Sequence, residues 1–153
     1  MSVFVGMLYM QLNPAVVGIC VLRRWGDWIK QSKAALAQAE DSLKQGHFWA
    51  SCFFSHQAAE FSVKALLAYL GVEARGHSVS ELLRKCSDMN VDFSKDLYRA
   101  ALNLDRHYLQ SRYVNTFYSG APVDYYTEQD AARALQEASM IVRAVEEKIG
   151  ELS

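Results

Sequence analysis

One short segment concentrates the side chains that could bind a phosphate group or a base. Residues 104–118 read Leu-Asp-Arg-His-Tyr-Leu-Gln-Ser-Arg-Tyr-Val-Asn-Thr-Phe-Tyr, and their cations and aromatic rings include Arg106, His107, Tyr108, Arg112, Tyr113 and Tyr118. Guanidinium groups suit phosphate oxygens, and aromatic faces stack on bases. The segment therefore predicts contact with a nucleotide or with single-stranded RNA. The alternative for Arg112 is structural, since an arginine at a helix end can cover the last carbonyl groups.

A second set of polar residues interrupts an apolar stretch. His56, Glu60 and Lys64 follow one another at i, i+4 spacing, so they share one face of a helix. They form either a paired seam inside a bundle or the wall of a pocket, because charges beside an apolar face need partners or access to water. A metal site would need a second matching pair on another helix, which the sequence lacks. We therefore expect no metal.

Turn and cap residues divide the chain after residue 24 into helices. Gly46 and Gly71 can end a first helix from about Asp27 and a second from about residue 48. His77 lies in the connection that follows, where on its own it does no more than help the turn. The spacing of Ser78 and Glu81 then predicts a capped short helix through about residue 89. Further expected caps are Ser94, for a fourth helix reaching Arg112 and Tyr113, and Thr127, for a fifth.

Apolar residues recur at helical spacing within each of these segments, and no strand pattern follows residue 24. The second segment is apolar over so broad a surface that it should contact helices on several sides. The predicted fold is all-α: an antiparallel four-helix up-and-down bundle with one additional short helix.

Bulk composition limits the possible functions. The chain has 153 residues with 16 basic and 17 acidic side chains, so no global field draws it onto a polyanion and any such contact must be local. Its three cysteines, Cys20, Cys52 and Cys86, have no spacing typical of a zinc or redox motif, and they are expected to be buried thiols in a reducing cytoplasm. No cofactor is expected.

Residues 1–24 differ in composition from the rest. Their apolar run before Arg23 and Arg24 has the length of a membrane segment, but Gln11, Asn13 and Pro14 interrupt it. The run lacks preceding basic residues and a secretory cleavage site. We expect no membrane anchor. A hairpin, a subunit-contact arm or residues added by an upstream start codon remain the alternatives.

Several motifs follow one another over about residues 25–150. They are Trp28, Phe54-Ser-His-Gln-Ala-Ala-Glu-Phe-Ser-Val-Lys-Ala-Leu-Leu67, Gly76-His-Ser-Val-Ser-Glu-Leu-Leu83, Tyr108-Leu-Gln-Ser-Arg-Tyr113 and Tyr126-Thr-Glu-Gln-Asp-Ala131. In this order they resemble the HEPN family. The resemblance implies a helical bundle that forms a homodimer, with 1–24 as an extension outside the domain.

The family resemblance implies two activities. Many members are metal-independent ribonucleases, often toxins, in which a histidine follows an arginine by four to six residues. Others act with a minimal nucleotidyltransferase in a toxin-antitoxin-like pair, and this chain resembles that branch at Gln57, Glu60, Lys64, His77, Arg112 and Tyr113.

The ribonuclease motif is incomplete. The positions four to seven residues after Arg112 are Thr116, Phe117, Tyr118 and Ser119. Arg99 is too far from His107, and Arg106 is too near it. General acid-base cleavage needs a group that titrates near neutrality, so an enzyme would depend on a displaced histidine such as His77.

The leading hypothesis is thus a cytoplasmic, non-catalytic, nucleotide-binding partner of a nucleotidyltransferase. Arg112 would hold phosphate, Tyr108 and Tyr113 would stack or orient a base, and Glu60 with Lys64 would position these groups, with His77 beside them. The alternatives are a metal-independent endoribonuclease that uses Arg112 and His77, and a purely structural dimerisation module.

Overall fold

A computed structural model describes residues 24–153, and these form helices joined by loops, with no strand. The expectations for 1–23, the apolar extension and Cys20, lie outside the described residues. Within residues 24–153 no helix is both long enough and apolar enough to cross a membrane.

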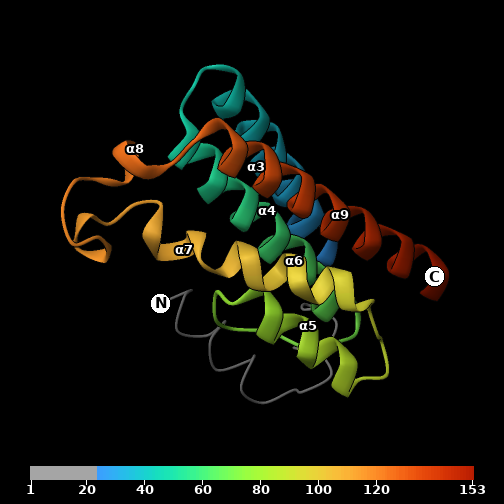
Figure 1. Ribbon diagram of the computed structural model, residues 1–153. Helices are drawn as coiled ribbons and strands as arrows, with labels where there is room; N and C mark the ends of the chain where they lie inside the picture. Colours follow the sequence, from blue (N-terminus) through green and yellow to red (C-terminus); the bar gives the residue numbers. More distant parts are fainter. Residues whose placement is uncertain (1–23) are drawn as a thin grey trace, which may run out of the picture.

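Three long helices, α3 (Trp25–Lys44), α4 (Phe48–Tyr69) and α9 (Glu128–Leu152), lie together with α4 between the others (Figure 1). The shorter α5 (Val79–Asp88) and α6 (Lys95–Asp105) pack on the remaining side of α4. The one-turn helices α7 (His107–Gln110) and α8 (Pro122–Tyr125) lead back to α9. The prediction of an all-α bundle is confirmed.

Helix α4 is the centre of the core, as its sequence predicts. Its fully buried residues include Cys52, Ala59, Val63, Leu66 and Leu67. A helix that is apolar almost all round must be covered on all sides, and α4 contacts α3, α5, α6, α7, α8 and α9. Polar side chains on such a helix are therefore enclosed by neighbouring elements.

The cap residues behave as predicted. Ser78, Ser94 and Thr127 each accept a hydrogen bond from a backbone N–H in the first turn of α5, α6 and α9. Gly46 and Gly71, with φ of 80° and 83°, end α3 and α4 in the left-handed conformation. Both described cysteines, Cys52 and Cys86, are buried, and burial raises the pKa of each thiol to about 12.

The predicted fourth helix is wrong in its extent. Helix α6 ends at Asp105, Arg106 keeps helical dihedrals (φ −61°, ψ −32°) outside the regular hydrogen-bond ladder, and α7 ends at Gln110. Arg112 and Tyr113 follow α7 as a turn in which both backbone N–H groups bond to the carbonyl of Leu109. The sequence does not predict the short helix α8, although Pro122 at its first position suits a helix start.

Candidate functional site

Glu60 anchors a polar cluster on α4. Its side chain is 1% exposed, and its carboxylate accepts a hydrogen bond of 2.8 Å from Lys64 Nζ. His77 Nδ1 lies 3.2 Å from Oε1 and 3.3 Å from Oε2 of the same carboxylate and donates to it. A buried carboxylate needs such partners, because desolvation without them is costly. Lys64 and His77 therefore compensate the buried charge.

Two contacts hold His77 in place beyond its bond to Glu60. The His77 carbonyl accepts a hydrogen bond of 2.8 Å from His56 Nε2. The His77 ring stacks on the Tyr108 ring, with 4.5 Å between centroids and 15° between planes. The side chain nevertheless stays 53% exposed. His77 thus joins the buried carboxylate of α4 to the surface at α7.

Arg112 reaches the same tyrosine. Its Nε donates to the Tyr108 carbonyl at 3.0 Å, and its Nη2 donates to the same oxygen. The guanidinium carbon lies 4.3 Å from the ring centroid of Phe53 and 4.8 Å from that of Tyr108. Covering a helix-end carbonyl satisfies the structural interpretation of Arg112. Among residues 24–153, Nη1 has no hydrogen-bond partner, so this nitrogen of the guanidinium group stays available for a ligand.

We call this set the Tyr108 cluster: Glu60, Lys64, His77, Tyr108 and Arg112. Tyr113, the sixth residue predicted from the sequence, borders it, because its ring centroid lies 5.0 Å from the Arg112 guanidinium and the residue is 48% exposed. The structure therefore brings the predicted residues together from α4, the α4–α5 connection and the end of α7.

The family follows from comparison with known proteins. The HEPN domain model matches residues 25–148. This chain belongs to the HEPN family. A curated relative, "Putative toxin MJ1304" of Methanocaldococcus jannaschii, is 27% identical over 132 residues, which are 81% of this chain and 87% of the relative.

Solved structures of similar chains agree with the fold. TT1696 from Thermus thermophilus superposes with a TM-score of 0.79 at 38% identity, over 82% of this HEPN chain and 98% of its own. ST0689, described as an archaeal HEPN homologue, gives a TM-score of 0.71 at 40% identity over the same shares. A HEPN domain protein from Thermotoga maritima gives 0.67 at 30% identity, over 81% and 98%.

The four histidines of this HEPN chain lie in different surroundings. His77 reaches the Tyr108 cluster, whereas His107 Nδ1 instead lies 2.9 Å from the Tyr126 hydroxyl. His56 is fully buried; its pKa is lowered by burial, against the opposing influence of Glu60 and Asp105. His56 Nδ1 has no hydrogen-bond partner among the described residues. Within residues 24–153, no three side chains of the metal-binding types are grouped to hold an ion.

Two residues of the site were missed by the sequence interpretation. Phe53 under the Arg112 guanidinium has the pattern of a core residue on α4, and only the fold reveals its second role. Asp105 binds the start of α5: its carboxylate accepts from Ser78 Oγ at 2.9 Å, Val79 N at 2.6 Å and Ser80 Oγ at 2.6 Å. Because these partners lie 25 to 27 residues away, no local sequence signal points to them.

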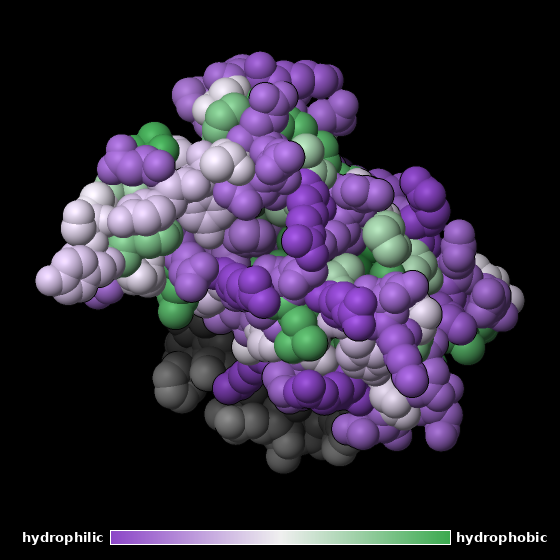
Figure 2. Space-filling model, in the orientation of Figure 1, coloured by the Kyte–Doolittle hydropathy of each residue, from purple (hydrophilic) through white to green (hydrophobic). Residues whose placement is uncertain are grey.

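The aromatic residues after the cluster form an exposed projection. Figure 2 shows the α7–α8 connection at the left as a pale to green surface beside more hydrophilic neighbours. The large exposed side chains there are Tyr113, Val114, Tyr118, Val123 and Tyr125. Phe117 and Tyr125 stack at 4.2 Å. Ring faces beside a guanidinium are a suitable surface for bases.

Proposed function

We propose that this HEPN protein binds a nucleotide at the Tyr108 cluster. The observation that carries the proposal is the chain of contacts from Glu60 through His77 to Tyr108, which ends in Arg112 at the surface. Such a chain fixes an aromatic ring and a guanidinium group from a buried helix. Preorganised groups bind a ligand without a further ordering cost.

The residues divide into two roles in this proposal. Arg112 offers Nη1 to a phosphate, and the exposed Tyr113 ring and the edge of Tyr108 contact the base. Glu60 and Lys64, with side chains 1% and 10% exposed, are too buried to contact the ligand first. They position His77, which in turn holds the Tyr108 ring.

Isothermal titration calorimetry with ATP, ADP and AMP tests this proposal. We expect saturable binding by the wild type and at least about tenfold weaker binding by Arg112→Gln, because a hydrogen bond to a charged group is lost. Arg143→Gln is the matched control, since Arg143 is exposed on α9 and has no ion pair among residues 24–153. Absence of heat with all three nucleotides, alone and with the transferase, would refute nucleotide binding.

As a finer proposal, the protein acts in the cytoplasm as a homodimer and pairs with a minimal nucleotidyltransferase in a toxin-antitoxin-like system. The support is the branch resemblance of the cluster residues, together with the M. jannaschii relative that is named as a toxin. Light scattering after size-exclusion chromatography tests the dimer. Co-expression with a nucleotidyltransferase encoded beside it tests the pair, and separate elution of the two proteins would count against it.

A second candidate is a metal-independent endoribonuclease. It is favoured by one observation: the His77 ring and the Arg112 guanidinium both contact the Tyr108 ring, so the two candidate groups border the same side chain although they are far apart in the sequence. This activity predicts RNA cleavage in EDTA that is lost in both His77→Ala and Arg112→Ala. Intact RNA after prolonged incubation with pure wild-type protein would eliminate it.

A further inference from the structure

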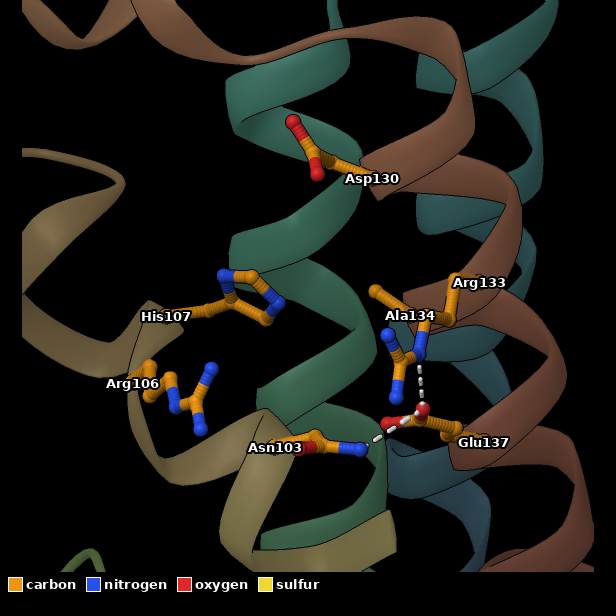
Figure 3. Close-up of a pocket in the computed structure, with 7 residues that line it drawn as sticks. All are labelled: Asn103, Arg106, His107, Asp130, Arg133, Ala134 and Glu137. Carbon is orange, nitrogen blue, oxygen red and sulfur yellow. Dashed lines mark hydrogen bonds and ion pairs between the residues drawn. The ribbon is translucent and has the colours of Figure 1, made fainter.

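A separate pocket of about 90 Å³ lies between α6, the start of α7 and α9 (Figure 3). It is lined by Asn103, Arg106, His107, Asp130, Arg133, Ala134 and Glu137. Its residues are distinct from the Tyr108 cluster, although His107 and Tyr108 are neighbours in the chain. An inference from this pocket therefore does not rest on the proposed function.

Both carboxylates of the pocket are already engaged by the protein. Glu137 Oε1 accepts hydrogen bonds from Arg133 Nε at 2.7 Å and from Asn103 Nδ2 at 3.1 Å. Asp130 Oδ2 accepts from the backbone N–H and the hydroxyl of Thr127, both at 2.9 Å, in the capping box of α9. Arg133 pairs the charge of Glu137, and the bonds from Thr127 fix the position of the Asp130 carboxylate.

Several donors, in contrast, remain unused. Arg133 is held through Nε, which leaves its terminal amino groups without a hydrogen bond to any of residues 24–153. The Arg106 guanidinium points into the pocket (Figure 3) and forms no ion pair with the described residues. His107 contacts Tyr126 through Nδ1, and Figure 3 shows its ring edge turned toward α9.

We infer that this pocket binds a phosphate group, supplied either by a free nucleotide or by a single-stranded RNA. Arg106 and Arg133 donate from opposite walls, and His107 Nε2 donates from the α7 side. Fork-shaped guanidinium groups match the spacing of phosphate oxygens. An adjoining hollow of about 390 Å³ shares Asn103, Arg133 and Glu137 and adds Arg99. The groove thus offers room for the rest of the ligand along α6 and α9.

The charge state of His107 provides a direct readout. Burial, with smaller effects from His56, Arg106 and Arg133, lowers the His107 pKa to about 4 against the opposing influence of Asp130, so the ring is neutral at pH 7. Phosphate placed between the two arginines would offset their influence and raise that pKa. The imidazole nitrogen signals in NMR spectra therefore report occupancy of this pocket.

The experiment titrates the full-length protein, labelled with nitrogen-15, with AMP and with a single-stranded oligouridylate that has no terminal phosphate. We expect the His107 signals to shift on addition of at least one titrant. In Arg106→Gln the apparent affinity should fall roughly tenfold, because a charge-assisted hydrogen bond is lost. Arg143→Gln on the same helix as Arg133 is the control and should bind like the wild type.

The two titrants identify the source of the phosphate. A shift with AMP alone indicates a free nucleotide, and a shift with oligouridylate alone indicates the backbone of an RNA strand; either supports the inference. No shift with both, or equal weakening by Arg106→Gln and Arg143→Gln, would overturn it. Arg133→Gln serves as a second variant if the melting temperature of Arg106→Gln is lowered.

Repeating the titration in Arg112→Gln separates the pocket from the Tyr108 cluster. A retained His107 shift in this variant, with calorimetric binding that Arg112→Gln does not weaken, would support the pocket and refute the proposed function. Calorimetric binding that depends on Arg112, with unshifted His107 signals, would support the Tyr108 cluster and refute the pocket.

Discussion

The imidazole of His77 and the phenol of Tyr108 form a near-parallel stack, 4.5 Å apart between centroids. The stack connects the loop before α5 to helix α7, and Glu60 fixes its orientation from inside the bundle through His77 Nδ1. A surface ring that would otherwise rotate freely is thereby held against a buried carboxylate. This relationship determines how each residue of the cluster should respond to substitution.

Tyr108→Ala should weaken nucleotide binding roughly tenfold, because the ring that contacts the base with its edge and packs against the Arg112 guanidinium is lost. Tyr108→Phe should bind nearly as well as the wild type, because the ring contacts to His77 and Arg112 do not require the hydroxyl. Calorimetry at constant salt measures both. Equal losses in the two variants would show that the hydroxyl, rather than the ring, contacts the ligand.

Glu60→Gln should lower the free energy of unfolding by about 3 kcal/mol, because removing one partner leaves Lys64 charged and 90% covered without its counter-ion. The matched control is Glu40→Gln, which breaks another i, i+4 pair with Lys44, at 3.1 Å on the surface. The control should cost less than about 1 kcal/mol. Urea unfolding measures the difference, and similar losses would mean that burial adds nothing to the Glu60 pair.

Arg112→Ala distinguishes ligand binding from the structural-module alternative. Without ligand, we expect a loss of about 1–2 kcal/mol from the contacts with Phe53 and Tyr108. Thermal unfolding with and without ATP measures whether the ligand stabilises each protein. If ATP stabilises the wild type and leaves the variant unchanged, Arg112 contacts the ligand. If ATP stabilises neither protein, the purely structural role stands.

Local contacts explain which features the sequence could predict. The caps at Ser78, Ser94 and Thr127 depend on groups within three residues, so spacing alone indicates them. The pair of Glu60 and Lys64 follows from i, i+4 geometry on one helix. Tyr108 and Arg112 could be named from the residue types of segment 104–118, whereas His77 could be named as a site residue only through the resemblance to the HEPN family. Their mutual contacts depend on how separate elements pack.

Non-local contacts explain what the sequence could not show. The carboxylate of Asp105 has the pattern of an ordinary charge near a helix end, and its role at the start of α5 appears only when α5 and α6 lie side by side. The interruption at Arg106 occurs without a glycine or a proline, so no breaker residue marks it. The sequence accordingly predicts the fourth helix as one unbroken element.

Asp105→Asn should lower the free energy of unfolding by about 1–3 kcal/mol, because a charged acceptor for the first turn of α5 is lost. Nucleotide binding should weaken as well, since Ser78, the cap residue of α5 that Asp105 holds, directly follows His77. Asp88→Asn is the control, because Asp88 is exposed on the same helix α5 and has no hydrogen bond or ion pair among the described residues. Urea unfolding and calorimetry test the two effects. A destabilised variant with unchanged affinity would separate α5 from the site.

Acidification should destabilise the protein through the buried His56 and the half-buried His107. Burial lowers the pKa of His107 from 6.5 to about 4, and it lowers that of His56. As pH falls below 6.5, the unfolded state takes up protons that the folded state refuses, so stability is complete above 6.5 and decreases toward pH 4. His107 contributes a slope of up to about 1.4 kcal/mol per pH unit in this window, and His56 acts in the same direction. Urea unfolding across the window should give a shallower dependence of stability on pH for His107→Gln than for the wild type.

Leu109→Gln, an exposed substitution on the same short helix, should keep the wild-type slope. An unchanged slope in His107→Gln would mean that His107 is protonated equally readily in both states, contrary to its burial.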